Sequence, residues 1–156
     1  MNMLMRITIT TVLCFAFGLA QAQGVASLGG ATSSNVRILN PQAFVIEASW
    51  LPTYLGGMDV SVGRFGPQDW VGSYSYLSVQ KTGSYQFGQI RPFYGLGLLA
   101  RTWTDQVDRV LSTPVNFSLS AGLDVGRLRV QYRHASNAGL SQPNHGQNWV
   151  LIGWRF

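Results

Sequence analysis

Apolar and polar residues alternate with period two through most of the chain beyond residue 22, and glycine, proline and polar clusters interrupt the alternation about every ten residues. This pattern is typical of a meander of antiparallel strands. It offers no convincing helix and no linker. It predicts eight strands, at residues 24–31, 42–51, 57–65, 70–80, 92–103, 115–125, 128–136 and 148–156. Segment 81–91 is ambiguous, because residues 84–90 fit either an extension of the fourth strand beyond a bulge or part of a long turn.

The last two predicted strands divide their apolar and polar side chains between opposite faces. In the seventh strand Arg129 and Arg133 alternate with apolar residues, and the last strand ends on Phe156, two residues after Trp154. A terminal Phe with this spacing resembles the carboxyl-terminal signature of outer-membrane barrels, so we expect the barrel assembly machinery as a partner. The alternative is a soluble antiparallel sandwich that happens to end in an aromatic strand.

The amino-terminal segment 1–22 has the features of a secretory signal peptide. Arg6 supplies the positive charge, residues 7–19 are apolar, and a small-x-small sequence ends the segment. The mature chain is expected to begin at Gln23. Charged residues make up 11% of the chain, against about 25% in soluble domains. We therefore expect residues 23–156 to form an eight-stranded antiparallel transmembrane β-barrel in the outer membrane.

Net charge and cysteine count narrow the classes of partner. The net charge of +5 suits a surface rich in lipid phosphates. Nucleic acid gives the same electrostatic signal, but an exported chain is not expected to meet it. The one cysteine, Cys14, lies in the predicted signal peptide, so no disulfide or thiolate site is expected. With two histidines and no clustered carboxylates, we expect no metal and no cofactor. Homodimerisation is left open.

Membrane physics fixes the direction of the side chains. An Arg facing lipid at mid-membrane costs roughly 2 to 4 kcal/mol, so Arg129 and Arg133 are expected to face a lumen filled by side chains. Glu47 shares the inward parity and is the natural counter-ion. Both termini of an even-stranded barrel lie on the periplasmic side. Loop 137–147 is therefore expected at the cell surface.

Three polar residues beside that loop carry candidate chemistry. His134 and Ser136 continue the outward parity of the seventh strand, and Asn148 continues that of the eighth. A Ser beside a His is the minimal pair of nucleophile and general base. The alternative is an interfacial hydrogen-bonding pair, since lipid-facing polar groups must find partners.

Residues 132–146 closely resemble the signature His-x-Ser-Asn-Ala-Gly-(x)3-Pro-Asn-x-Gly of the lipid A 3-O-deacylase family, called PagL. The resemblance implies an eight-stranded barrel that hydrolyses an acyl ester of lipid A, the lipid part of lipopolysaccharide, without a metal. It implies Ser136 as nucleophile and His134 as base. The chain departs from the family at Asn148, where characterised members carry the Glu that orients the His. An Asn can fix the tautomer but stabilises the imidazolium less than a carboxylate does.

The loop after the serine offers candidates for oxyanion and substrate binding. They are Asn137, Asn144 and the backbone N–H of Gly139, with ordinary turn chemistry as the alternative. Two other functions stay open besides ester hydrolysis: a catalytically impaired barrel that binds lipopolysaccharide, and a structural small barrel. Four arginines near the outer strand ends are candidate phosphate ligands, with loop or ion-pair roles as the alternative: Arg64, Arg101, Arg109 and Arg133.

Overall fold

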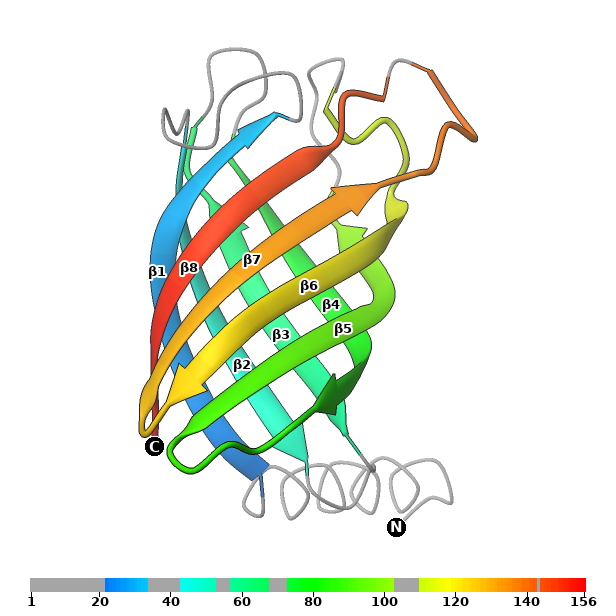
Figure 1. Ribbon diagram of the computed structural model, residues 1–156. Helices are drawn as coiled ribbons and strands as arrows, with labels where there is room; N and C mark the ends of the chain where they lie inside the picture. Colours follow the sequence, from blue (N-terminus) through cyan, green and yellow to red (C-terminus); the bar gives the residue numbers. More distant parts are fainter. Residues whose placement is uncertain (1–21, 34–42, 53–56, 68–72, 103–109, 143) are drawn as a thin grey trace, which may run out of the picture.

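The computed structural model describes residues 22–33, 43–52, 57–67, 73–102, 110–142 and 144–156. Each strand pairs antiparallel with the next, and β1 pairs with β8, so the sheet closes into the barrel of Figure 1. The predicted all-β, eight-stranded antiparallel fold is confirmed. The strands are β1 (Ala22–Ser33), β2 (Ala43–Pro52), β3 (Met58–Phe65), β4 (Tyr74–Ser84), β5 (Ile90–Arg101), β6 (Val115–Val125), β7 (Leu128–Ser136) and β8 (Gln147–Arg155).

Seven strands lie within two residues of their predicted limits, and β6 and β7 match them to the residue. The fourth strand differs, because β4 covers Tyr74–Ser84 where the sequence pattern predicts 70–80. The ambiguous segment 81–91 divides between two structures. β4 runs on to Ser84, and the chain then turns through a bridge in which Phe87 and Ile90 exchange backbone hydrogen bonds of 2.8 and 2.9 Å. No helix among these residues is long and apolar enough to cross a membrane. The predicted signal peptide lies outside the described residues apart from Ala22, and stays a prediction.

The two ends of the barrel differ in the length of their connections. At one end, here called the loop end, the strands are joined by 34–42, 66–73, 102–114 and 137–146. At the other, the turn end, the connections are 53–57, 85–89 and 126–127. The carboxyl terminus lies at the turn end (Figure 1). Long loops at one end and short turns at the other are typical of outer-membrane barrels.

The outer wall of the barrel is apolar. Large hydrophobic side chains on every strand point away from the lumen, which is the reverse of a water-soluble fold and the arrangement that a lipid solvent requires. Exposed members of this set include Leu28, Phe44, Ile46, Val62, Leu77, Val79, Tyr94, Leu96, Leu98, Phe117, Leu119, Leu123, Val130, Ile152 and Trp154.

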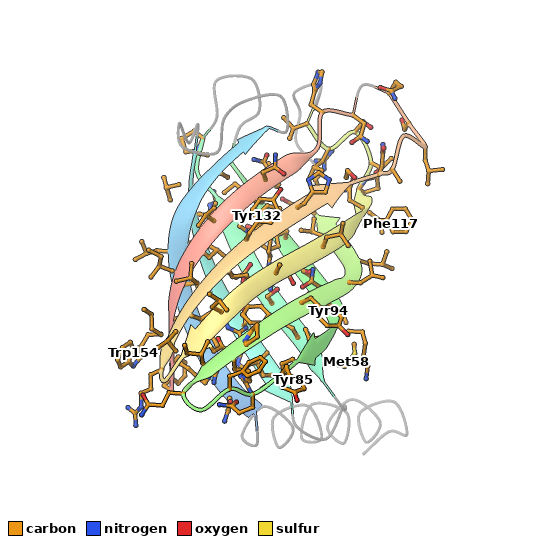
Figure 2. All side chains as sticks on the ribbon, viewed as in Figure 1. Met58, Tyr85, Tyr94, Phe117, Tyr132 and Trp154 are labelled. Carbon is orange, nitrogen blue, oxygen red and sulfur yellow. The ribbon has the colours of Figure 1, made fainter. Side chains whose placement is uncertain are left out.

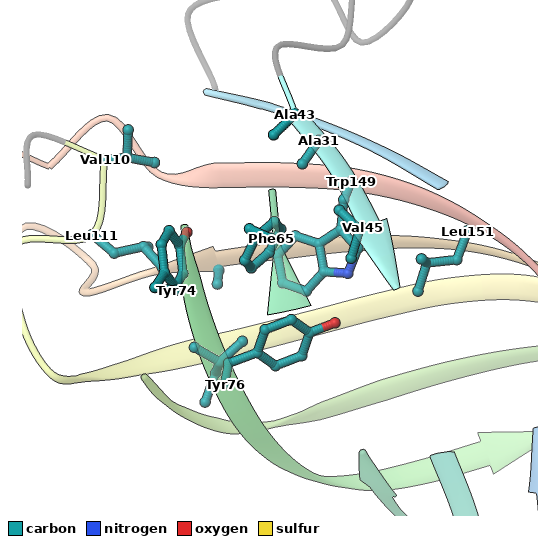
Figure 3. Packing of buried hydrophobic residues seen from close by; sticks show 12 residues of the cluster. Ala31, Ala43, Val45, Phe65, Tyr74, Tyr76, Val110, Leu111, Trp149 and Leu151 are labelled. Atoms are coloured by element: carbon teal, nitrogen blue, oxygen red, sulfur yellow. The ribbon is translucent and has the colours of Figure 1, made fainter. Parts of the chain in front are cut away.

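The lumen near the loop end is filled by an aromatic cluster. The ring of Phe65 lies 4.8 Å from that of Tyr74, 5.0 Å from Tyr76 and 5.2 Å from Trp149, measured between centroids. Val110 and the neighbouring Leu111, from the β5–β6 connection, are buried in the same cluster (Figure 3). The lumen is therefore a packed core here, as expected for eight strands.

Ion pairs occupy the rest of the lumen. Arg133 is 0% exposed and lies 3.3 Å from both Glu47 and Asp59, and Asp59 also contacts Arg129 at 3.4 Å. Nearer the turn end, Asp124 pairs with Arg129 at 2.7 Å, with Arg91 at 2.8 Å, and with Arg155. The predicted inward direction of the β7 arginines and the role of Glu47 as counter-ion are confirmed.

Because two carboxylates depend on Arg133, removing this side chain leaves buried charge without compensation. We expect Arg133→Ala to lower the free energy of unfolding by about 3–5 kcal/mol. The matched control Arg127→Ala changes an exposed arginine in the β6–β7 turn, and we expect it to cost less than about 0.5 kcal/mol. Urea titration of the heat-modifiable folded form in detergent measures both. Equal stabilities of the two variants would contradict the role given to the lumen ion pairs.

The barrel closes beside its last residue. Gly24 and Phe156 exchange backbone hydrogen bonds of 3.2 and 3.0 Å, and a Cβ added at Gly24 would lie 2.5 Å from Phe156 Cε2. Deleting Phe156 removes this closing pair along with the predicted assembly signal. We expect less membrane-inserted, heat-modifiable protein after the deletion and a normal amount with Phe156→Tyr. Normal insertion of the truncated chain would count against an assembly role.

Candidate functional site

His134 and Asn148 are cross-strand partners on the outer wall near the loop end. The β7–β8 register pairs the two residues directly, and the β6–β7 register puts Leu119 opposite His134 and Phe117 opposite Ser136. Inward neighbours such as Ala135 are buried in the lumen. The alternation of the strands therefore brings the polar set together on the lipid-facing side, as the sequence predicts. Figure 2 shows Tyr132 beside β7 and β8 and Phe117 at the loop end of β6.

The side chain of Asn148 orients the imidazole. Its Oδ1 lies 2.8 Å from His134 Nδ1 and also accepts a hydrogen bond of 2.7 Å from the Tyr132 hydroxyl. An amide oxygen only accepts, so Nδ1 carries a proton, and in the neutral imidazole Nε2 is then the unprotonated nitrogen. An imidazole in this tautomer can act as a base through Nε2. The role of the Tyr132 hydroxyl is not predicted from the sequence, where this residue counts only as an apolar member of β7.

Gly146 closes the other side of the imidazole. A Cβ added there would lie 3.0 Å from His134 Cε1 and 3.6 Å from Nε2, and the backbone φ of +66° also favours glycine. Ser136 is half-buried, two residues beyond His134 on the same face of β7. No hydrogen bond joins Ser136 Oγ to His134 within the described part of the chain. Ser136 and His134 thus lie on the same wall near the loop end, and Asn148 contacts the Nδ1 atom of His134 rather than its Nε2 atom.

The loop after Ser136 begins with a tight turn built by Asn137. Ala138 and Gly139 have φ values of 55° and 83°, as in a type I′ turn, and the Leu140 N–H donates to the Asn137 carbonyl at 3.1 Å. The left-handed conformation costs a non-glycine residue about 1–2 kcal/mol. The side chain of Asn137 offsets this cost, because its Oδ1 accepts the Gly139 N–H at 2.9 Å.

Asn137 also ties the loop to the β5–β6 connection. Its Nδ2 donates to Ser112 Oγ at 2.8 Å and to the Ser141 carbonyl at 2.9 Å. Gly146 N–H donates to the Val110 carbonyl at 2.9 Å. Residues 110–112 thus form the support on which the loop rests. Their contribution could not be found in the sequence, because nothing in the local pattern links the two segments.

The three predicted oxyanion groups differ in what they have left to donate. The Asn137 amide hydrogens and the Gly139 N–H are already engaged within the loop, which favours the turn interpretation for both. Asn144 is half-buried, and its Oδ1 accepts a long bond of 3.5 Å from the Asn137 N–H. Its Nδ2 donates no hydrogen bond to another described residue. Asn144 is therefore the member of the set whose side chain keeps a donor for a ligand.

The four arginines that are candidate phosphate ligands have different environments. Arg133 is enclosed in the lumen, so the phosphate role is wrong for it. Arg101 donates to the carbonyls of Leu111 and Thr113 at 2.6 and 3.2 Å, which makes it a loop anchor. Arg64 is exposed on the outer wall and donates to Ser73 Oγ at 2.9 Å. Arg109 lies outside the described residues. Among the described residues, no three His, Cys, Asp or Glu side chains lie close enough together to hold a metal ion.

Comparison with known proteins connects this geometry to a family. A family model described as "Lipid A 3-O-deacylase (PagL)" matches residues 43–156. A search of curated proteins gave no match. The crystal structure of the outer membrane enzyme PagL aligns with a TM-score of 0.63 at 20% identity, over 86% of this chain and 99% of that one.

Two other barrels align less closely. Neisserial surface protein A gives a TM-score of 0.56, over 86% of this chain and 94% of its own. The N-terminal β-barrel domain of Pseudomonas aeruginosa OprF gives 0.55, over 87% and 98%. Both are 13% identical to this chain. At such identities the structural likeness concerns the fold.

The hydrogen bonds of Asn137 predict how the loop responds to its loss. Asn137→Ala frees the Gly139 N–H and removes the hydrogen bonds to Ser112 in the support and to the Ser141 carbonyl in the same loop, each with a net value of about 1 kcal/mol. We expect the amides of Gly139 and Leu140 to exchange with solvent about tenfold faster in hydrogen exchange measured on detergent-solubilised barrel. Asn144→Ala, which removes one long bond, serves as control and should leave these rates nearly unchanged. Equal exchange in both variants would contradict the organising role of Asn137.

Proposed function

The chain belongs to the lipid A 3-O-deacylase (PagL) family, and from this premise we propose that it is an outer-membrane serine esterase that hydrolyses the 3-O-linked acyl ester of lipid A. The observation that carries the proposal is the hydrogen bond from His134 Nδ1 to Asn148 on the lipid-facing wall. It leaves Nε2 as a base on the wall that also carries Ser136. A membrane-embedded substrate approaches from that side.

In the proposed reaction, Ser136 Oγ attacks the ester carbonyl while His134 Nε2 takes the hydroxyl proton. The tetrahedral intermediate collapses as the imidazolium returns this proton to the sugar oxygen, which leaves as a hydroxyl group. Water then attacks the acyl-serine, with His134 again accepting and returning a proton, and the fatty acid is released. Catalytic hydrogen bonds are often long without substrate and shorten when it binds, so we expect the Ser136–His134 bond to form in the complex.

Asn144 is proposed as the side-chain donor to the oxyanion. The negative charge on the carbonyl oxygen grows as the nucleophile attacks, and an N–H directed at it stabilises the transition state more than the ground state. Asn137 and Gly139 contribute indirectly in this proposal, because their hydrogen bonds shape the loop that carries Asn144. This assigns them positioning roles.

The acyl chain of the substrate has an apolar surface available beside the site. Phe117 and Leu119, opposite Ser136 and His134 in the β6–β7 register, are 45% and 48% exposed on the outer wall. An acyl chain that lies along β6 would bring its ester carbonyl to the loop end of β7. The topology of even-stranded barrels puts that end at the outer leaflet, where lipopolysaccharide resides.

One observation favours a second candidate function. Asn148 supplies no negative charge to stabilise the imidazolium, and loss of a triad carboxylate can cost on the order of 10⁴-fold when the wrong tautomer results. A barrel that binds lipopolysaccharide without turnover would not need a carboxylate at position 148. The hydrogen bond that Asn148 does make supports the active alternative, because it selects the tautomer that the reaction needs.

Substitutions at the three residues test the mechanism. We expect Ser136→Ala and His134→Ala each to lower lipid A deacylation by about 10³-fold or more. Asn148→Ala should reduce it, and Asn148→Glu should preserve or raise it. The measurement is mass spectrometry of lipid A incubated with purified barrel, in which the loss of one hydroxyacyl mass reports turnover.

The control is His145→Ala, which removes the other histidine of the chain and should leave turnover within about twofold, as expected of a residue outside the reaction. Full activity in Ser136→Ala would refute the esterase mechanism. An inactive natural chain that gains activity with Asn148→Glu would instead support the binding function.

A further inference from the structure

The hydroxyl of Tyr132 is a polar group on a wall that otherwise requires apolar ones. The side chain is 36% exposed, and its hydroxyl donates a 2.7 Å hydrogen bond to Asn148 Oδ1, the same oxygen that receives the His134 Nδ1 proton. In the register Tyr132 stands opposite Val150 and diagonal to Asn148. Asn148 is 6% exposed, so the shared oxygen is screened from solvent. Two donors therefore meet at one acceptor.

An amide at this position creates an ambiguity that a carboxylate does not have. A carboxylate presents an acceptor whichever way it turns, whereas Asn148 presents either its oxygen or its NH₂ group to His134. If the NH₂ group faced the imidazole, Nδ1 would become the acceptor and the proton would move to Nε2. His134 could then take no proton from Ser136. The orientation of one amide thus selects between an active and an inactive tautomer.

Tyr132 breaks this symmetry. A phenol is a better donor than acceptor, because its oxygen lone pairs are delocalised into the ring, so its hydroxyl prefers the amide oxygen over the NH₂ group. Water competes poorly for the hydroxyl on a lipid-facing wall. We propose that Tyr132 is a positioning residue that holds the Asn148 oxygen toward His134 and thereby keeps the imidazole in the tautomer with Nε2 unprotonated. The effect of Tyr132 on catalysis rests on the proposed esterase function, whereas its effect on the His134 tautomer is independent of that function.

A double-mutant cycle separates this role from a structural one. Tyr132→Phe keeps the ring and removes the hydroxyl. In the natural chain we expect kcat for lipid A deacylation to fall about three- to tenfold, the equivalent of one hydrogen bond, while KM stays nearly constant. In the background of Asn148→Asp, where both terminal atoms accept, we expect the same change to cost less than about twofold. Tyr94→Phe, which alters another exposed tyrosine, on β5, is the matched control.

A second measurement needs no activity. Nitrogen NMR of ¹⁵N-histidine-labelled barrel in detergent, in mildly alkaline buffer, distinguishes the two neutral tautomers, and the His134 signals are assigned by their loss in His134→Ala. We expect the Nδ1-protonated tautomer in the natural chain and a mixture or the Nε2-protonated form in Tyr132→Phe. With Asn148→Asp, Tyr132→Phe should leave the Nδ1-protonated form in place.

The outcomes distinguish the two proposals. An inactive natural chain in which Tyr132→Phe still shifts the tautomer would refute the esterase function and support the positioning role. If the natural chain is active and Tyr132→Phe changes neither the His134 tautomer nor kcat, the positioning role alone would be overturned. An equal loss of kcat in the natural chain and in the Asn148→Asp background would also overturn the positioning role. The hydroxyl would then stabilise the local structure and would not orient the Asn148 amide.

Discussion

Each strand of a transmembrane barrel has one face toward lipid and the other toward the lumen, and it can keep charged side chains only on the lumen face. Every second residue of β7 therefore faces a lumen where Arg133 and Arg129 meet the carboxylates of Glu47, Asp59 and Asp124. These pairs are expensive to bury and strongly destabilising to break singly. They also fix which face of each strand is inside. Once the inner face of each strand is set, the residues of the outer wall are set as well, including its few polar ones.

The candidate site inherits its geometry from the register of the barrel. His134 meets Asn148 because β7 and β8 pair at that point. A slip of one residue by either strand would turn that strand's member of the pair into the lumen and separate the two side chains. The register is held on the inner face by the ion pairs and by the packing of Trp149 against Phe65. The strands thus hold His134, and the loop beyond Ser136 is held separately by Asn137 and residues 110–112.

Alternation along the chain is sufficient to predict the strands, the inward arginines, Glu47 and the shared wall of His134 and Asn148. These features depend on parity, which is a local property of sequence. The role of Asp59 and the bond from Tyr132 to Asn148 are not predicted, because they depend on which side chains meet across the barrel. The hydrogen bond from Asn137 to Ser112 is not predicted for the same reason, because Ser112 belongs to a segment that no local pattern connects to the loop.

The outward position of His134 and Asn148 determines which measure of substrate concentration governs encounters with this site. A site on the lipid-facing wall is reached by lateral diffusion within the leaflet, so encounters depend on the mole fraction of substrate among neighbouring lipids rather than on its amount per volume of water. In the proposed reaction, the fatty acid and the remaining lipid would be released into the same leaflet and would compete with substrate for the same wall. Diluting the membrane with inert lipid or detergent would therefore slow such a barrel as effectively as removing its substrate.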